Sequence, residues 1–285
     1  MNDMSERTKG ILLVVSAVLL FGTWGILAKL IPASPLLLIF TLQAAGVIAF
    51  FFAAPMGSFS SLSRKEHLFI IAATLCITIS DLTFLAAVKT LPTVANAILV
   101  RYTFPLVVVF LAPLLLREAF SKRAVFAVGL GLAGLATILA DDLGSYNGYG
   151  VSMALISAVA FAMFLVFLKK VLSSVSVRVW LSYRFVLAFV ALLPVVLVSE
   201  SFSAWNPQFV GSLLGFGLLF GVVGTFLHME GIRRISVQEV SILGYIEPLS
   251  ATVYAIFLLS EIPTLSVLAG GMLIIASGII VVTRK

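Results

Sequence analysis

The feature that most constrains this chain is its series of long, continuous apolar runs. A helix needs about 20 apolar residues to cross the hydrocarbon core of a bilayer, and ten such runs occur within the 285 residues. They are Gly10–Leu30, Ser34–Ala54, Leu68–Val88, Val94–Leu115, Ala124–Ala140, Gly150–Leu172, Val177–Val198, Phe209–Met229, Val237–Leu259 and Leu265–Thr283. The runs do not alternate between polar and apolar residues, which excludes the strands of a membrane barrel. The sequence therefore predicts an all-α integral membrane protein with ten transmembrane helices.

Composition excludes several other classes of protein. Hydrophobic residues make up 61% of the chain and charged residues only 11%, whereas soluble domains carry about 25% charged residues. One cysteine, Cys76, and two histidines, His67 and His228, provide neither an internal disulfide nor a His-rich metal centre. We expect no cofactor and no nucleic-acid partner. The expected partners are the lipid bilayer and a small-molecule substrate, and we expect a monomer, with a dimer as the alternative.

The basic residues predict the orientation in the membrane. If the N-terminus lies in the cytoplasm, 14 of the 18 lysines and arginines fall in cytoplasmic segments, as the positive-inside rule requires. Lys29 and Lys89 then lie outside, and Arg101 and Arg184 lie within apolar runs. Because ten is an even number, the C-terminus is also expected in the cytoplasm.

The chain also repeats itself. A shift of 143 residues superposes Tyr102 on Tyr245, Pro105 on Pro248 and Glu118 on Glu261, and a shift of 141 superposes Lys29 on Lys170 and Gln43 on Arg184. Each copy holds five runs, so the second copy is expected to enter the membrane upside down. We predict two inverted five-helix repeats, residues 10–140 and 148–283, around a central cavity. Such repeats are typical of secondary transporters, whose substrate site lies near the midplane. The alternative is chance similarity between apolar helices.

At these residues the sequence resembles the EamA family of the drug/metabolite transporter superfamily. The resemblance covers residues 11–140 and 148–282 and is carried by Glu247-Pro248, Leu258-Leu259-Ser260-Glu261 and the glycines of the last run, with Phe104-Pro105 and Leu115-Leu116-Arg117-Glu118 as weaker counterparts. The paired Tyr-x-x-Pro motifs are similar to those of YddG-type amino-acid exporters. The resemblance implies a ten-helix bundle around a cavity, export of small metabolites, often amino acids, and a location in the bacterial inner membrane.

Ionisable residues within the apolar runs are the main site candidates, because a charge in the bilayer costs about 2.5 kcal/mol or more and needs a partner. We expect Arg101 and Glu247 to meet across the cavity, since they lie on corresponding faces of the two repeats. Pro105 and Pro248 are expected to kink their helices and to free the carbonyls of Arg101 and Gly244. The pair either closes the bundle as a structural ion pair or binds the carboxylate and amine of a zwitterion.

The other candidates are weaker, and each has an alternative. We predict substrate contacts from Arg101, Tyr102, Glu247, Tyr245, Trp24, Gln43 and Arg184, and proton coupling through Asp81, Glu247 or His228. The tyrosines alternatively pack between helices, and Trp24, like Trp180, alternatively belongs to the interfacial aromatic belt. Asp81 has no basic residue one turn away in its own run and alternatively bonds to Thr78. Arg184 is expected to pair with Asp81 or Glu247, and His228 to join an interfacial cluster with Glu230, Arg233 and Arg234.

These features favour a secondary transporter that exports small polar metabolites, with amino acids as the expected substrates. ATP is not expected to drive it directly, because no Walker motif is present. Within transport, the alternative is a lipophilic-cation drug exporter, which the arginines at 101 and 184 disfavour. An intramembrane enzyme built on His228 and Glu230 is a more remote alternative, because no nucleophile or second histidine lies nearby in the sequence. We therefore expect no catalytic residues and no metal site.

Overall fold

Helices form all the regular structure that the computed structural model describes. It describes residues 5–51, 62–104, 106–108, 111, 122–140, 147–200, 206–235, 243–244 and 246–282. Five helical segments are long and apolar enough to cross a membrane: Glu6–Leu30, Arg64–Thr90, Gly148–Leu172, Val177–Ser199 and Pro207–Ile232. Shorter apolar helices lie in the other predicted runs. The helical class is confirmed, while the number of crossings stays a prediction.

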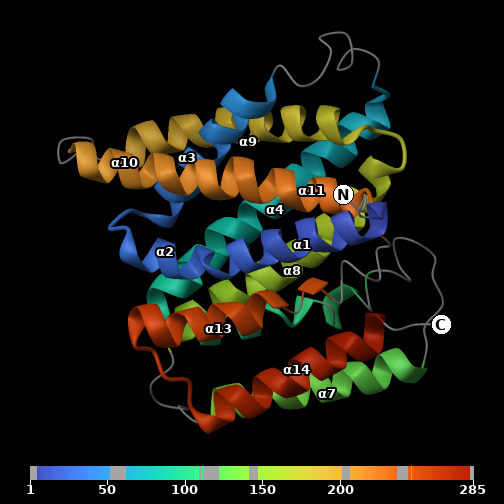
Figure 1. The fold of residues 1–285 in the computed structure, drawn as a ribbon, viewed down its shortest axis with the longest axis vertical. Helices are drawn as coiled ribbons and strands as arrows, with labels where there is room; N and C mark the ends of the chain where they lie inside the picture. Colours follow the sequence, from blue (N-terminus) through green and yellow to red (C-terminus); the bar gives the residue numbers. More distant parts are fainter. Residues whose placement is uncertain are drawn as a thin grey trace.

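The helices keep the labels of Figure 1 throughout. In chain order they are α1 Glu6–Gly22, α2 Trp24–Leu30, α3 Pro35–Phe50, α4 Arg64–Thr90, α5 Val94–Arg101, α7 Lys122–Ala140, α8 Gly148–Leu172, α9 Val177–Ser199, α10 Pro207–Phe216, the π-helical segment η3 Gly217–Gly224, α11 Thr225–Ile232, α13 Ile246–Leu259 and α14 Leu265–Val282.

Hydroxyl and amide side chains set where many of these helices begin. Ser34, Thr93, Ser176 and Asn206 each accept a hydrogen bond from a backbone amide in the first turn of the helix that follows. Ser63 does the same for α4 and forms a reciprocal capping box with Glu66. These caps satisfy amides that have no partner within the helix, so the chain re-enters an apolar helix directly after each polar turn.

Two apolar segments depart from regular α-helix. The first predicted run breaks at Thr23, between α1 and α2, where the Thr23 hydroxyl donates to the Leu20 carbonyl at 2.7 Å. The eighth predicted run passes through η3, and the Thr225 hydroxyl donates to the Phe220 carbonyl, five residues back, at 3.0 Å. Both irregularities border the buried aromatic residues Trp24 and Phe220, which stack on each other at 5.9 Å.

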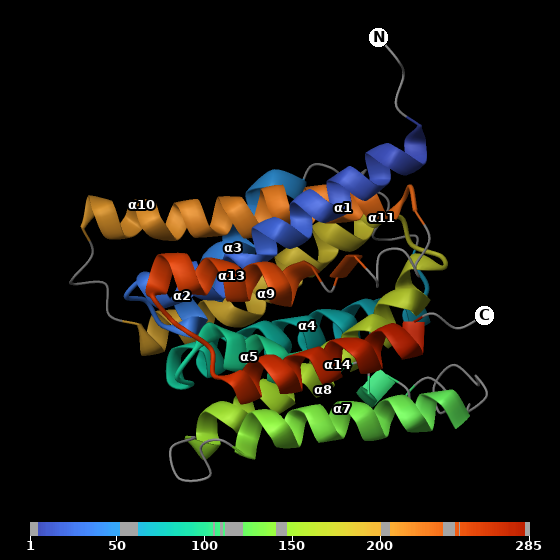
Figure 2. The same ribbon diagram turned by 60° about the horizontal axis from the view of Figure 1, so that its bottom comes forward.

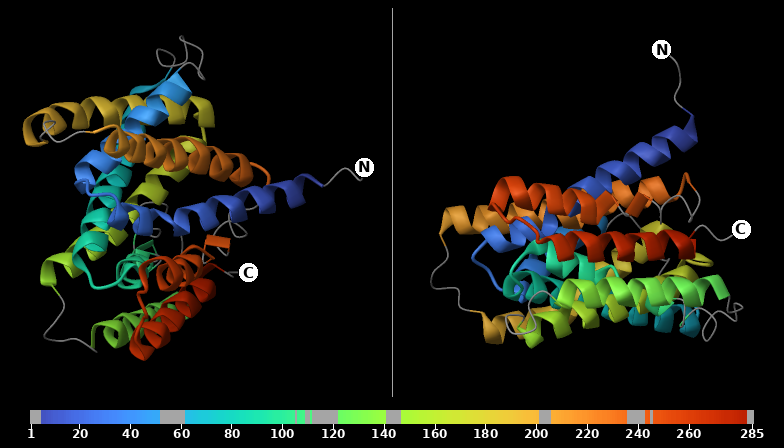
Figure 3. Two further views of the ribbon diagram at one scale, coloured as in Figure 1. Left: turned by 60° about the vertical axis from the view of Figure 1, so that its left-hand side comes forward. Right: turned by 90° about the horizontal axis from the view of Figure 1, so that it is seen from below.

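The helices pack as a small set of neighbouring pairs. Helix α4 lies along α8, α7 along α14, α3 along α9 and η3, and α1 along α11 and α13. The α7–α14 pair forms the lower edge of the bundle in Figure 1 and in the left view of Figure 3. Small residues make these seams close: Ser80 and Ser157 exchange hydrogen bonds between α4 and α8, and Gly134 of α7 meets Gly270 of α14. Close approach through small residues is typical of membrane helices.

The two ends of the bundle differ in charge. Helix α1 begins and helix α14 ends at the same end (Figures 2 and 3). Arg234, after α11, contacts Glu6 in the first turn of α1, and Lys170 near the end of α8 lies over Phe69 near the start of α4. We call this the basic end. At the opposite end, Gly150 packs against Thr90 and Leu91.

The contact between η3 and α3 predicts a glycine-dependent stability. A Cβ on Gly221 would lie 2.5 Å from the Leu42 carbonyl oxygen, whereas a Cβ on Gly215, on the same segment, would meet nothing within 4 Å. Gly221→Ala should therefore lower the stability by about 1–3 kcal/mol, the usual cost of overpacking. Gly215→Ala is the matched control and should leave the stability unchanged or slightly higher. Thermal unfolding in detergent measures both, and equal midpoints would contradict the close packing.

Candidate functional site

The interior of the bundle holds a buried arginine surrounded by partners from several helices. Arg101, the last residue of α5, is 5% exposed. Its Nη2 lies 3.6 Å from Asp81 Oδ1 and donates to Ser80 Oγ at 3.4 Å. Asp81 and Phe84 are three residues apart on α4, so both face the guanidinium. We therefore take Arg101 and Asp81 as the centre of the candidate site.

Aromatic rings cover the faces of the Arg101 guanidinium. Its Cζ lies 4.6 Å from the Phe84 ring, 4.8 Å from Phe161 and 5.9 Å from Trp24. Such cation–π contacts strengthen when water is excluded. Among the described residues, the buried Trp24 indole nitrogen has no hydrogen-bond partner, which leaves an N–H donor beside the cation. Trp24 thus lies in the protein interior and not in the interfacial belt.

Tyr102, the tyrosine of the first proline motif, bonds to the segment that contains the second one. Its hydroxyl donates to the Gly244 carbonyl at 2.8 Å, and Gly244 is four residues before Pro248. A proline cannot donate to the carbonyl four residues back, so Tyr102 satisfies the carbonyl that Pro248 frees. The same hydroxyl interacts with the Glu247 carboxylate, which also interacts electrostatically with Arg101. This arrangement supports the interpretation of Tyr102 as a helix-packing residue that orients Glu247.

A second buried arginine lies on α9. Arg184 stacks at 4.3 Å on the ring of Phe185 and interacts electrostatically with Asp81. Across the α3–α9 interface, Phe185 packs directly against Gly46, one turn from the buried Gln43. Asp81 thus lies in the fields of both Arg101 and Arg184.

An ion pair closes the end of the bundle opposite the basic end. Lys29 Nζ of α2 lies 2.5 Å from Glu261 Oε1 and also donates to the Pro92 carbonyl at 3.1 Å. The other Glu261 oxygen accepts from the Val94 amide at 2.7 Å, at the N-terminus of α5, where a carboxylate also complements the helix dipole. The positive φ of Ser260, 56°, turns the chain sharply before Glu261. Glu261 therefore joins α2, α5 and the loop after α13.

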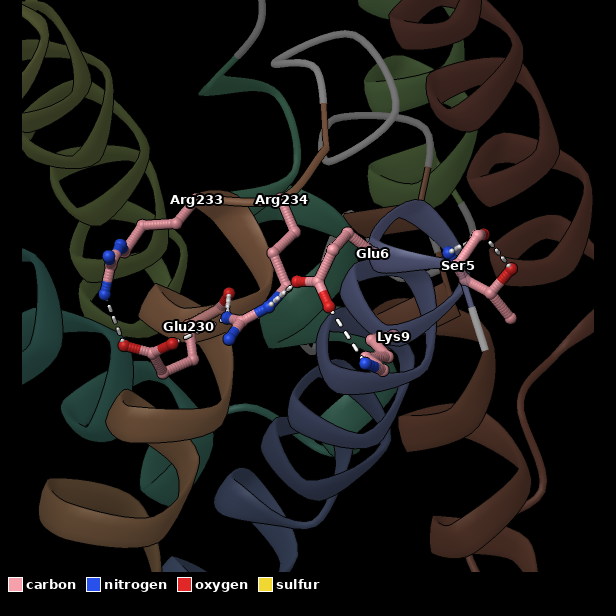
Figure 4. A network of polar contacts seen from close by, with 7 residues as sticks. Ser5, Glu6, Lys9, Glu230, Arg233 and Arg234 are labelled. Carbon is pink, nitrogen blue, oxygen red and sulfur yellow. Dashed lines mark hydrogen bonds and ion pairs between the residues drawn. The ribbon is translucent and has the colours of Figure 1, made fainter. Parts of the chain in front are cut away.

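The basic end is held by a separate network. Figure 4 shows Arg234 between two carboxylates, with Nη1 2.6 Å from Glu230 and Nε 3.1 Å from Glu6. Arg233 pairs with Glu230 at 2.8 Å, and Lys9 pairs with Glu6 at 2.9 Å. The hydrogen bond to Glu230 raises the pKa of Arg234 above its ordinary value. The network ties the start of α1 to the end of α11.

A surface pocket of about 690 Å³ also opens near the basic end, between the α8–α9 turn and the end of α11. It is lined by Leu172, residues 175–179, Ile232 and Arg233. None of the site residues predicted from the sequence lines this pocket, so the interior remains the candidate site.

Some sequence-based expectations differ from the structure. The ion-pair partner of Arg101 is Asp81, from a different run, and not Glu247. His228 does not join the Glu230 network; it packs edge-on against Phe21 at 5.7 Å. Trp180 is fully buried and does not belong to an interfacial belt. Pro105 and Tyr245 lie outside the described residues.

Sequence reasoning missed the neutral residues around the arginine. Ser80, Phe84 and Phe161 all contact Arg101, yet serine and phenylalanine inside an apolar run carry no signal of their own. The spacing offers a partial signal, because Ser80 adjoins Asp81 and Phe84 follows it by one helical turn. Phe161 comes from α8 and is brought to the site only by packing.

Comparison with known proteins yields one family and several relatives. A model of the EamA-like transporter family matches residues 8–140 and again 148–283. The chain is 28% identical to the uncharacterized transporter YvbV of Bacillus subtilis (strain 168), over 98% of this chain and 93% of the relative. It is 29% identical to an uncharacterized transporter of Archaeoglobus fulgidus, over 71% of each. A solved crystal structure, 20% identical, matches its fold with a TM-score of 0.65 over 96% of both chains.

The Arg101–Asp81 pair predicts a strong dependence of stability on Asp81. Asp81→Asn removes the partner's charge from a buried guanidinium, and breaking one side of a buried ion pair costs about 3–5 kcal/mol. We expect a lowered unfolding midpoint in detergent. The double variant Asp81→Asn with Arg101→Gln should lose less stability than the sum of the two single variants. An Asp81→Asn protein as stable as the wild type would contradict the pairing.

The Lys29–Glu261 contact predicts a measurable coupling energy. Both side chains are largely buried, at 20% and 14% exposed, so a double-mutant cycle with Lys29→Met and Glu261→Gln should give about 1–2 kcal/mol, above the median for surface pairs. The exposed Lys9–Glu6 pair is the control and should give no resolvable coupling. Unfolding in detergent measures both cycles, and similar values for the two pairs would show that Lys29–Glu261 is only a surface contact.

Proposed function

Because the chain belongs to the EamA-like transporter family, we propose that it is a secondary transporter that exports small polar metabolites, amino acids above all, by alternating access. The observation that carries this proposal is the polar interior: Arg101, Arg184 and Asp81 are buried in a membrane bundle, together with hydrogen-bonding atoms that have no protein partner among the described residues. Intramembrane charges of this kind mark substrate or ion pathways.

The packing pairs support two inverted repeats, residues 10–140 and 148–283. Under the shifts of 141 and 143 residues, α1 corresponds to α8 and α4 to the segment ending in α11. Helices α1 and α11 pack together, and so do their counterparts in the other repeat, α8 and α4. The pairs α3–α9 and α7–α14 each correspond to themselves, because the shift carries one helix of each pair onto the other. A two-fold axis in the membrane plane produces this pattern, and ten crossings follow if every apolar helix spans the bilayer.

The site chemistry suits a zwitterion. A substrate carboxylate would bind the Arg101 guanidinium, which offers a planar fork of donors, and would accept from the Trp24 indole N–H, which has no partner within the described part of the chain. The substrate ammonium would lie against Asp81 or Glu247. Substrate binding thus replaces the Arg101–Asp81 ion pair with equivalent pairs to the ligand, so that no charge is left without a partner in the membrane.

Transport requires the two ends of the bundle to open in turn. The Lys29–Glu261–Val94 contacts close one end and the Glu6–Arg234–Glu230 network closes the other. We place the basic end in the cytoplasm by the positive-inside rule, with both termini there, in the inner membrane of a bacterium. Export then needs the network to break first on the cytoplasmic side and the Lys29–Glu261 pair to break on the outer side.

The second candidate is export of lipophilic cations, which the aromatic rings of Trp24, Phe84 and Phe161 favour. In the structure, however, these rings already surround the Arg101 guanidinium. A cationic drug would have to displace a fixed cation or lie beside it, which like-charge repulsion opposes. We therefore rank amino acids first and keep lipophilic cations as an outcome of the assay.

Fluxes in reconstituted vesicles test the proposal. We expect saturable uptake of amino acids, lowered at least about 10-fold by Arg101→Ala and by Glu247→Gln, because hydrogen bonds to charged groups contribute about 1.5–3 kcal/mol. Arg178→Gln, an exposed arginine on α9, is the control and should transport normally. An imposed pH gradient distinguishes proton antiport, which gives accumulation, from facilitated diffusion, which does not.

Three results would overturn parts of this proposal. Normal flux in both Arg101→Ala and Glu247→Gln would remove the assigned binding site. Flux of tetraphenylphosphonium without flux of any amino acid would favour the drug exporter. Flux of neither would leave small polar metabolites of another class as the substrate and would refute the assignment to amino acids.

A further inference from the structure

The second arginine, Arg184, differs from Arg101 in having no polar contact that the described part of the chain supplies. Its guanidinium stacks on Phe185, but among the described residues it makes no hydrogen bond and no ion pair within 4 Å. Asp81, its electrostatic neighbour, already pairs with Arg101. A cation that is 8% exposed inside a membrane bundle needs an anion or water. Glu247, the second carboxylate of the interior, interacts with Arg101 and Tyr102, so no carboxylate among the described residues is in direct contact with Arg184.

Unused hydrogen-bonding groups lie on the helices next to Arg184. Gln43 on α3 is 1% exposed, and neither its Oε1 nor its Nε2 has a partner in the described ranges. Thr78 on α4 is buried, and its hydroxyl likewise has no partner there. Thr78 lies on the same face of α4 as Asp81, the electrostatic neighbour of Arg184. Gln43 lies one turn before Gly46 on α3, and Gly46 contacts Phe185, the residue that follows Arg184. Buried polar atoms are rarely left unpaired, so these atoms, on two helices that pack against α9, indicate a site for a ligand.

We propose that Arg184, Gln43 and Thr78 form a side-chain subsite that binds a second carboxylate, so that the preferred substrates are acidic amino acids. This inference rests on the proposed function. The donors of the subsite, a guanidinium, an amide NH₂ and a hydroxyl, all match a carboxylate. Asp81 interacts with both arginines, so one carboxylate would bind at Arg101, the other at Arg184, and the ammonium at Asp81 between them.

The charge count distinguishes this substrate from a neutral amino acid. A neutral zwitterion supplies one carboxylate and leaves Arg184 as it is. Glutamate supplies two carboxylates for the two arginines and one ammonium for Asp81, while Glu247 keeps its contact with Tyr102. Glutamine has the same shape as glutamate and lacks only the second charge, so the two form a matched pair of probes.

Competition between these probes in reconstituted vesicles tests the subsite. For the wild type, L-glutamate should be preferred to L-glutamine about 10- to 100-fold in apparent affinity, the range for a hydrogen-bonded charge pair. Arg184→Gln should abolish this preference by weakening glutamate alone. Arg184→Lys should keep part of it, and Arg178→Gln should keep all of it. Unfolding in detergent checks that each variant is folded.

The outcomes separate this inference from the function on which it rests. Equal affinity of the wild type for glutamate and glutamine overturns the subsite and leaves amino-acid transport intact. Equal weakening of both probes by a folded Arg184→Gln protein also overturns it, because Arg184 would then act on the common part of the substrate. Absence of flux for every amino acid refutes the proposed function and the subsite together. The wild-type comparison needs no variant, so a failure of Arg184→Gln to fold does not block the test.

Discussion

The burial of the Arg101 guanidinium is the constraint on which the rest of this interior depends. A charge in hydrocarbon is tolerated only with partners, and no single helix supplies them. Asp81 and Ser80 come from α4, Phe161 from α8 and Trp24 from α2. Four helices are thus held in one arrangement around one cation. The break at Thr23 directly precedes Trp24, and the Ser80–Ser157 bonds join α4 to α8, the helices that carry Asp81 and Phe161.

The proline motifs show how the bundle tolerates irregular backbone at membrane depth. An unsatisfied carbonyl in lipid costs several kcal/mol. Tyr102 removes this cost at Gly244 by a hydrogen bond across 142 residues of sequence, and the same hydroxyl interacts with Glu247. One side chain, Tyr102, therefore both satisfies the Gly244 carbonyl and orients the Glu247 carboxylate. Where the backbone departs from a regular helix next to charged residues, a membrane protein can form a polar site that is not exposed to lipid.

The contacts at the two ends of the bundle differ in their exposure to water. The Lys29–Glu261 pair is largely buried and shares its carboxylate with the Val94 amide. In the network at the basic end, Glu6, Lys9 and Arg233 are exposed, whereas Arg234 and Glu230 are partly buried, at 29% and 23% exposed. Salt and water therefore screen the exposed pairs at the basic end more than they screen Lys29–Glu261.

The sequence by itself determined the class of this protein: a helical membrane chain with few charges, whose intramembrane ionisable residues are Asp81, Arg101, Arg184, His228 and Glu247. Hydropathy and charge are local properties, so they can be read without knowing which helices touch. Only the tertiary structure decided the partners. Arg101 pairs with Asp81 and not Glu247, Tyr102 bonds to Gly244, His228 packs on Phe21, and Lys29 reaches Glu261 across 232 residues. Each of these contacts depends on the rotation and neighbours of whole helices, and an almost uniformly apolar helix carries no pattern that specifies which of its faces turns inward.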